Sequence, residues 1–114
     1  MPAPSPAPAT MEEFVDRGFE DHASDAAGVF DRLPSGLPLA DTPRRCFLLA
    51  HLATHVAGEH LGRWDEGLAL LARIGALPSF DPGTNEGRGV RRLEAVLHLC
   101  AGRKGEAERL LALA

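Results

Sequence analysis

The chain has 114 residues, of which 45% are hydrophobic and 25% charged, a composition typical of one globular domain and not of a disordered segment. Its net charge is −4, so it lacks the excess of Lys and Arg with which proteins neutralise nucleic-acid phosphates. No stretch approaches the roughly 20 apolar residues that span a bilayer. Nucleic acid and membrane are therefore excluded as expected partners.

The N-terminal segment 1–9 alternates Pro with small residues and predicts a disordered tail ahead of a helical domain over residues 10–114. The segment has neither a basic start nor an apolar centre, so it does not resemble a secretory signal, and we expect a cytoplasmic protein. Cys46 and Cys100 are expected to be reduced thiols, because the repeat register described below separates them by about 21 Å along the helix axis.

Helix signals dominate the rest of the chain. Thr10 followed by Glu13 forms a capping box, which predicts a helix from residue 11. Thr42 followed by Pro43 predicts the start of a second helix. Two segments rich in helix breakers, 34–40 and 78–89, predict loops. Strand-like alternation is nearly missing, so the sequence predicts an all-α fold.

Internal similarity divides the helical part into repeats. Three segments align without gaps and begin at residues 20, 61 and 101: EDHASDAAGVFDRL, LGRWDEGLALLARI and AGRKGEAERLLALA. One aligned column holds small residues in all three segments, namely Ala26, Gly67 and Ala107. A spacing of 41 and then 40 residues has room for two helices and a loop. The sequence therefore predicts three stacked antiparallel helix hairpins.

The repeats resemble a known family. In the second segment, Gly62, Trp64, Gly67 and Leu71 stand where tetratricopeptide repeats have a turn glycine, an aromatic, a small residue and a large packing residue. The third segment repeats three of these positions: Gly102, Ala107 and Leu111. The units are longer than the family's repeat of about 34 residues, and the two breaker-rich loops account for the excess. The resemblance implies a short superhelix of helix hairpins.

The resemblance also implies a binding surface, because the first helix of each tetratricopeptide hairpin lines a concave groove that holds a segment of a partner protein. Carried over by register, the groove positions are Met11, Val15, Phe19, Leu49, Leu52, Val56, Glu59, His60, Arg92, Val96, Leu99 and Cys100. Most are apolar, so an exposed groove would accept an amphipathic helix or an apolar peptide. The same face could instead be the closed core of the bundle, and periodicity does not separate these two cases.

Size, acidity, repeat number and an apolar groove are also similar to those of the small chaperones of type III secretion. The resemblance implies that the chain is a protein-binding module, an adaptor or a chaperone, with no cofactor. A self-associating subunit, in which the apolar face closes a homodimer, is the alternative. The sequence does not identify the partner.

Histidines give a further hypothesis. His51, His55 and Glu59 are four residues apart, so they project from one stripe of an α-helix. Two such histidines can chelate a transition metal with a carboxylate as the third ligand. His60 lies next to this stripe, about 100° around the helix. Because neither HExxH nor CxxC occurs, surface histidines without a metal are the alternative.

Catalytic patterns are missing. The segment GTNEGRG at residues 83–89 fits neither phosphate-binding glycine motif, and the carboxylates Glu12 and Glu13 are placed to cap a helix start. Two arginine pairs, 44–45 and 91–92, stand at the starts of equivalent helices and could bind an acidic partner segment. No set of nucleophile, base and orienting group is apparent, so the sequence predicts no enzyme.

Overall fold

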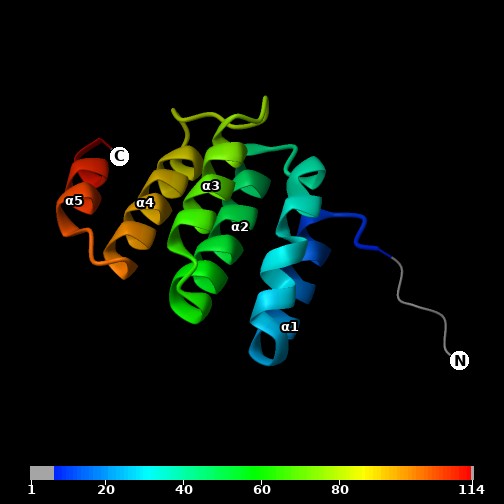
Figure 1. Cartoon of the computed structure of the whole chain (residues 1–114). Coiled ribbons are helices and arrows are strands. Elements are labelled where there is room, and N and C mark those ends of the chain that lie inside the picture. Colours follow the sequence, from blue (N-terminus) through cyan, green and yellow to red (C-terminus); the bar gives the residue numbers. More distant parts are fainter. Residues whose placement is uncertain (1–6, 114) are drawn as a thin grey trace, which may run out of the picture.

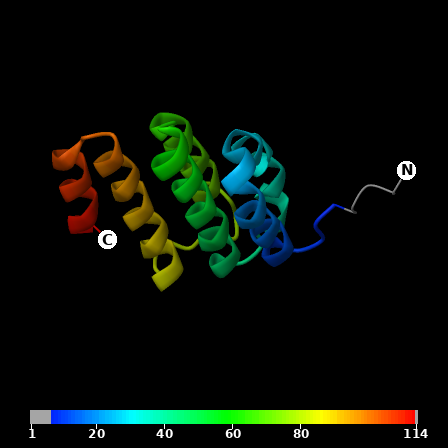
Figure 2. The same cartoon turned by 90° about the horizontal axis from the view of Figure 1, so that it is seen from below.

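The structure is a computed structural model that describes residues 7–113, and within this range it contains helices and no strand. The α-helices are α1 (Met11–Arg32), α2 (Pro43–Thr54), α3 (Trp64–Gly75), α4 (Asn85–Cys100) and α5 (Lys104–Leu113). A 3₁₀ helix, η1 (Leu33–Leu39), follows α1, and a π-helix, η2 (His55–Leu61), continues α2. The helices lie side by side in a row that begins with α1 and ends with α5 (Figures 1 and 2). The prediction of an all-α fold is confirmed.

Both predicted helix starts are confirmed by their capping hydrogen bonds. The Thr10 hydroxyl accepts a hydrogen bond from the backbone N–H of Glu13 at 3.2 Å. The Thr42 hydroxyl accepts one from the backbone N–H of Arg45 at 3.1 Å. These bonds satisfy donors that have no partner inside the first turn of a helix. The first predicted loop, 34–40, is instead mostly helical, since residues 33–39 form η1.

The second predicted loop, 78–89, is too long, because its last residues are helical in the structure. Residues 85–89 form the first turns of α4, because the Thr84 hydroxyl accepts a hydrogen bond from the backbone N–H of Gly87 at 3.0 Å and caps the helix. Two of the glycines that suggested a loop, Gly87 and Gly89, belong to α4 and allow close packing. A Cβ atom on Gly89 would lie 2.8 Å from the Phe47 ring, so only glycine lets α4 approach α2 this closely.

Helix α1 is bent into two arms at Asp25, whose φ of −151° and ψ of 67° are not helical. The Asp25 carboxylate accepts a hydrogen bond from the backbone N–H of Gly28 at 2.9 Å, which caps the second arm. The arms lie side by side in both views (Figures 1 and 2). Val29 from the second arm and Val15 from the first belong to the same buried core. The bend therefore folds α1 back on itself.

One main core joins α1, α2, η2, α3 and α4, and a separate small cluster of Ala95, Ala107 and Leu110 joins α4 to α5. Gly67 lies where α3 crosses its neighbours. A Cβ atom on Gly67 would be 2.9 Å from the Ala57 Cβ and 3.2 Å from a Leu97 methyl carbon. This close approach explains the small residue that the repeat alignment singled out.

Three further predictions concern the tail, the thiols and the membrane. Most of the predicted tail lies outside the described residues, and of the rest, Ala9 donates its backbone N–H to the Glu13 carboxylate at 3.2 Å. Cys46 is buried and Cys100 exposed, and both are free thiols, as predicted. Over residues 7–113, no helix combines the length and the apolar character that crossing a bilayer requires.

Candidate metal centre

The π-helix η2 brings two histidines onto one face. In an α-helix, residues five apart point about 140° away from each other. The wider turn of a π-helix is closed by i→i+5 hydrogen bonds, so His55 and His60 lie nearly one above the other. Their Nε2 atoms are 3.1 Å apart, and their ring centroids are 4.7 Å apart. Gly62 ends the π-helix in the left-handed conformation, with a φ of 64°.

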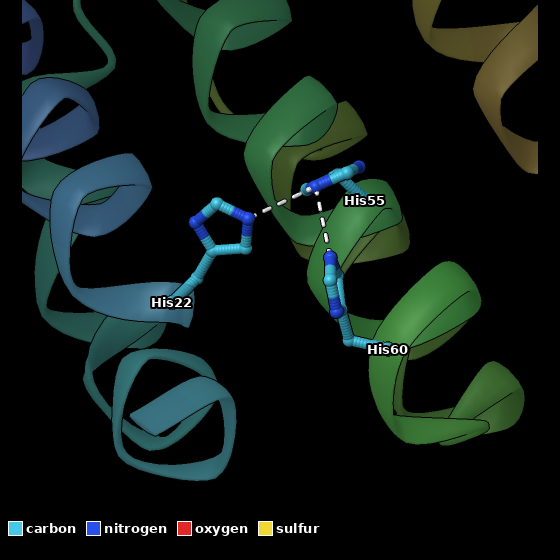
Figure 3. A group of neighbouring side chains, drawn as sticks. All are labelled: His22, His55 and His60. Carbon is cyan, nitrogen blue, oxygen red and sulfur yellow. Dashed lines mark hydrogen bonds between the residues drawn. The ribbon is translucent and has the colours of Figure 1, made fainter. Parts of the chain in front are cut away.

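A third histidine comes from α1. Gly18 has no side chain, and Leu52 of α2 fills the space, since a Cβ atom on Gly18 would lie 2.5 Å from a Leu52 methyl carbon. His22 is one helical turn beyond Gly18, and His55 is one turn beyond Leu52. The close crossing of α1 and α2 therefore sets His22 opposite His55. Their Nε2 atoms are 3.2 Å apart (Figure 3).

The three histidines of this cluster, His22, His55 and His60, point toward one another from two helical segments (Figure 3). One ring nitrogen from each lies within 4.8 Å of the other two. His22 and His55 are half-buried and His60 is exposed, so the cluster lies at the surface between α1 and η2. The Phe19 ring packs beside it, with its centroid 5.8 Å from that of His22 and 5.7 Å from that of His55.

The outer nitrogens of two rings already have partners. His22 Nδ1 is 2.5 Å from the backbone carbonyl oxygen of Phe19, and His55 Nδ1 is 2.6 Å from a Glu59 carboxylate oxygen. A carbonyl and an ionised carboxylate only accept hydrogen bonds, so each Nδ1 must carry the hydrogen. In a neutral imidazole the other nitrogen then holds a lone pair. The two Nε2 atoms that face each other at 3.2 Å are therefore both acceptors.

Two facing lone pairs need a cation between them. His55 Nε2 has one lone pair, yet it is close to both His22 Nε2 at 3.2 Å and His60 Nε2 at 3.1 Å. A hydrogen bond donated by neutral His60 satisfies only one of these two contacts. The contact with His22 becomes favourable when a ring is protonated or when a metal ion takes both lone pairs.

The spacing also fits a metal ion. A zinc ion binds histidine nitrogens at about 2.0–2.1 Å in a tetrahedron, so two ligand nitrogens are about 3.3 Å apart. The two separations that involve His55 are 3.1 and 3.2 Å, and all three ligand nitrogens lie within 4.8 Å of one another. Histidine ligands of metals usually donate their second N–H to a carboxylate or a backbone carbonyl, which fixes the tautomer and the ring orientation. Glu59 and the Phe19 carbonyl are in these positions for His55 and His22.

The histidine cluster differs from the predicted metal stripe in two of its three residues. His51 does not join the cluster, because its ring stacks on Phe47 with an interplanar angle of 7° and a centroid distance of 5.9 Å. Glu59 contacts the outer nitrogen of His55, Nδ1, and so lies outside the group of facing ring nitrogens. His55 is the one residue that the predicted stripe shares with the cluster. His60 is added because η2 is a π-helix, and His22 because α1 crosses α2 at Gly18.

The predicted groove residues divide into two groups. Five belong to the main core and are at most 7% exposed: Met11, Val15, Leu49, Leu52 and Val56. They do not line an open surface, because α1, α2 and η2 pack their apolar faces against each other. At or near the surface are Phe19, Glu59, His60, Arg92, Val96, Leu99 and Cys100, with Leu99 50% exposed. Phe19 and Glu59 lie beside the histidine cluster, and His60 belongs to it.

Comparison with known proteins adds no assignment. No family model, no curated protein and no solved structure matches this chain. The metal centre is therefore argued from the geometry of the chain's own residues.

Proposed function

We propose that the protein binds one transition-metal ion between α1 and η2, with the Nε2 atoms of His22, His55 and His60 as ligands. The observation that carries the proposal is the pair of Nε2 atoms of His22 and His55, which face each other at 3.2 Å while both Nδ1 atoms are held by acceptors. Neutral imidazole ligands suit zinc, copper, nickel and cobalt.

The bound ion acts as a cross-link between two segments that are distant in the sequence. His22 and His55 are 33 residues apart, and their helices meet only in the folded chain. An ion that binds the folded chain and not the unfolded one stabilises the fold in proportion to the logarithm of its concentration. The proposed role of the ion is thus to stabilise the N-terminal part of this helical domain.

Calorimetric titration of the metal-free full chain with zinc tests this proposal. We expect one zinc per chain, loss of binding in His55→Ala, and unchanged binding in His51→Ala, which is the matched control from the same helix. Unchanged affinity in His55→Ala, or an equal loss in His51→Ala, contradicts the proposed ligand set. Circular dichroism of each variant shows that the fold is retained.

We also propose that the helices form three tetratricopeptide-like hairpins. Gly62 and Gly102 are the only residues with positive φ in the described part of the chain, and they occupy equivalent positions of the aligned segments. The arginine after each glycine reaches back to an earlier helix: Arg63 to Asp31 at 3.3 Å, and Arg103 to Asp65 at 2.8 Å. These recurring features support the second and third hairpins, and we propose the bend at Asp25, four residues after the aligned position Asp21, as the turn of the first.

Protein binding, as an adaptor or a chaperone, is the second candidate function. One observation favours it, a surface groove between the N-terminal parts of α2 and α4. Arg44, Phe47, Leu48, Gly89 and Arg92 contribute to its lining. Apolar side chains lie between two exposed arginines and one carboxylate, Glu86, and such a lining suits an amphipathic helix or an apolar peptide flanked by charged residues. The free thiols support the further proposal that the chain works in a reducing cytoplasm.

A charge placed in this groove tests the second candidate. Leu48→Glu should lose a partner that the wild type captures from native lysate, while Leu113→Glu, at a leucine 72% exposed on α5, should keep it. Equal capture by both variants contradicts the groove. Light scattering over a dilution series tests the homodimer, which remains a prediction.

A further inference from the structure

The histidine cluster offers three ligands and no fourth. Within residues 7–113, His22, His55 and His60 form the one group of at least three His, Cys, Asp or Glu residues whose ligand atoms could share a metal ion. Closed structural zinc sites have four protein ligands, whereas sites with three keep a position for water or another external ligand. The number of protein ligands therefore decides whether the ion has a position for an external ligand.

The nearest carboxylate does not supply the missing ligand. Glu59 is held at the outer nitrogen of His55, 2.6 Å from Nδ1, and the metal-facing Nε2 lies on the other side of the same ring. While Glu59 orients His55, its carboxylate cannot reach an ion at Nε2. If it released His55, the ring would lose the partner that fixes its tautomer.

The remaining candidates are held elsewhere. His51 is stacked on Phe47. Cys46 is buried, with its sulfur 3.4 Å from the Ser79 hydroxyl. Cys100 lies on the α4 side of the π-helix, where a Cβ atom on Gly58 would be 3.4 Å from the Cys100 sulfur. The cluster faces α1 instead, so neither thiol is placed to bind an ion there.

Solvent can reach the fourth position. His60 is exposed, His22 and His55 are half-buried, and the His55 side chain is 28% exposed. Three neutral imidazoles leave the full double charge on a divalent ion, and Glu59 next to His55 balances only one unit of it. A site with this charge and an open position favours a small anion over a second neutral ligand.

We propose that the bound metal ion keeps an open fourth position, which holds an exchangeable water and accepts a small monoanion in its place. The inference rests on the proposed metal binding. It makes the centre a ligand-binding site at the surface, in addition to a cross-link between α1 and η2. The exchange forms one metal–anion bond, breaks one metal–water bond and releases the water.

Cobalt(II) as the bound metal and azide as the probe test the proposal. The full chain is loaded with less than one equivalent of Co²⁺, so that free cobalt is negligible, and azide is added while the visible absorption is recorded. We expect the cobalt bands to shift and to saturate at one azide per cobalt. His51→Ala should give the same titration, because His51 lies outside the cluster.

The outcomes separate the two proposals. If calorimetry shows no cobalt or zinc binding, the proposed function itself is wrong. If the metal binds at one per chain and azide leaves the spectrum unchanged, the fourth position is closed and only the present inference is overturned. Light scattering of the cobalt-loaded chain gives the remaining check. A metal-dependent dimer that resists azide would mean that a second copy supplies the fourth ligand, which also overturns the inference.

Discussion

The two ends of the helical row are packed in different ways. At the N-terminal end, α1 contacts α2 and η2 through the main core, in which Met11, Leu49 and Leu52 are fully buried. At the C-terminal end, α5 is held by the small cluster with Ala95, Ala107 and Leu110. Because α5 buries so little apolar surface, it should open locally more often than α1 does.

The polar contacts also differ between the two ends. The contact of α1 with η2 includes three imidazoles whose ring nitrogens lie within 4.8 Å of one another, the group proposed to bind the metal ion. The residue that precedes α5, Arg103, makes an exposed ion pair with Asp65 at 2.8 Å, and this pair is complete without any added ion. The comparison teaches that metal should stabilise one end of the protein and leave the other unchanged.

The largest effect is expected from Gly18→Leu. The added Cβ atom alone would lie 2.5 Å from a methyl carbon of the fully buried Leu52, and the rest of the leucine side chain should push α1 away from α2, at a cost of about 3 kcal/mol for overpacking. The same movement separates His22 from His55 and should abolish zinc binding. Urea unfolding and calorimetry measure the two effects.

The control for this variant is Gly105→Leu in α5. Nothing lies within 4 Å of a Cβ atom built on Gly105, and leucine has the higher helix propensity, so a stabilisation of up to about 1 kcal/mol is expected. If Gly18→Leu is as well tolerated as Gly105→Leu, the close crossing of α1 and α2 is not present in solution.

Zinc should slow hydrogen exchange at the N-terminal end of the row and not at the C-terminal end. At a free zinc concentration 100 times the dissociation constant, binding stabilises the folded state by about 2.7 kcal/mol. We expect slower exchange in α1 and η2, no change in the local opening of α5, and reversal of the protection by a chelator. Equal protection of α5 would contradict a cross-link confined to the N-terminal end.

The helical part of the fold could be predicted because its signals are local. Capping threonines such as Thr10 and Thr42 act within three residues, so the sequence shows them directly. The start of α4 could not be placed, because Gly89 belongs to a helix for a reason that lies in α2, where the Phe47 ring fills its missing side chain. Glycine alone indicates a loop, and only the tertiary contact reverses that indication.

The histidine cluster could be predicted only in part. His55 was found from its spacing, but α-helical geometry placed His51 beside it and His60 away from it. The π-helix reverses this arrangement, and nothing in the sequence of residues 55–61 distinguishes a π-helix from an α-helix. His22 depends on the crossing of α1 with α2, and a sequence pattern within one helix cannot show such a contact.

A smaller effect is expected from Glu59→Gln. The amide can still accept a hydrogen bond from His55 Nδ1, but it lacks the negative charge that makes the imidazole a stronger ligand. We expect zinc affinity to fall about 10- to 100-fold, the range measured when such partners of ligands are removed. Glu20→Gln, at an exposed position of α1, should leave the affinity unchanged. An unchanged affinity in Glu59→Gln would mean that Glu59 does not orient His55.

The smallest effect is expected at the other end of the row, from Arg103→Gln. The hydrogen bond from Arg103 holds the pKa of the Asp65 carboxyl below its usual value, so the pair stabilises the fold above the usual range of aspartate. This contribution is lost as the pH falls through the lowered pKa of the folded state. Because both side chains are exposed, the loss should be a slight decrease in the urea midpoint at pH 7. The difference from the wild type should vanish in acid and should not depend on zinc.

Arg73→Gln, which removes an exposed positive charge from α3, is the control. A zinc-dependent effect of Arg103→Gln would show that the two ends of the protein are coupled.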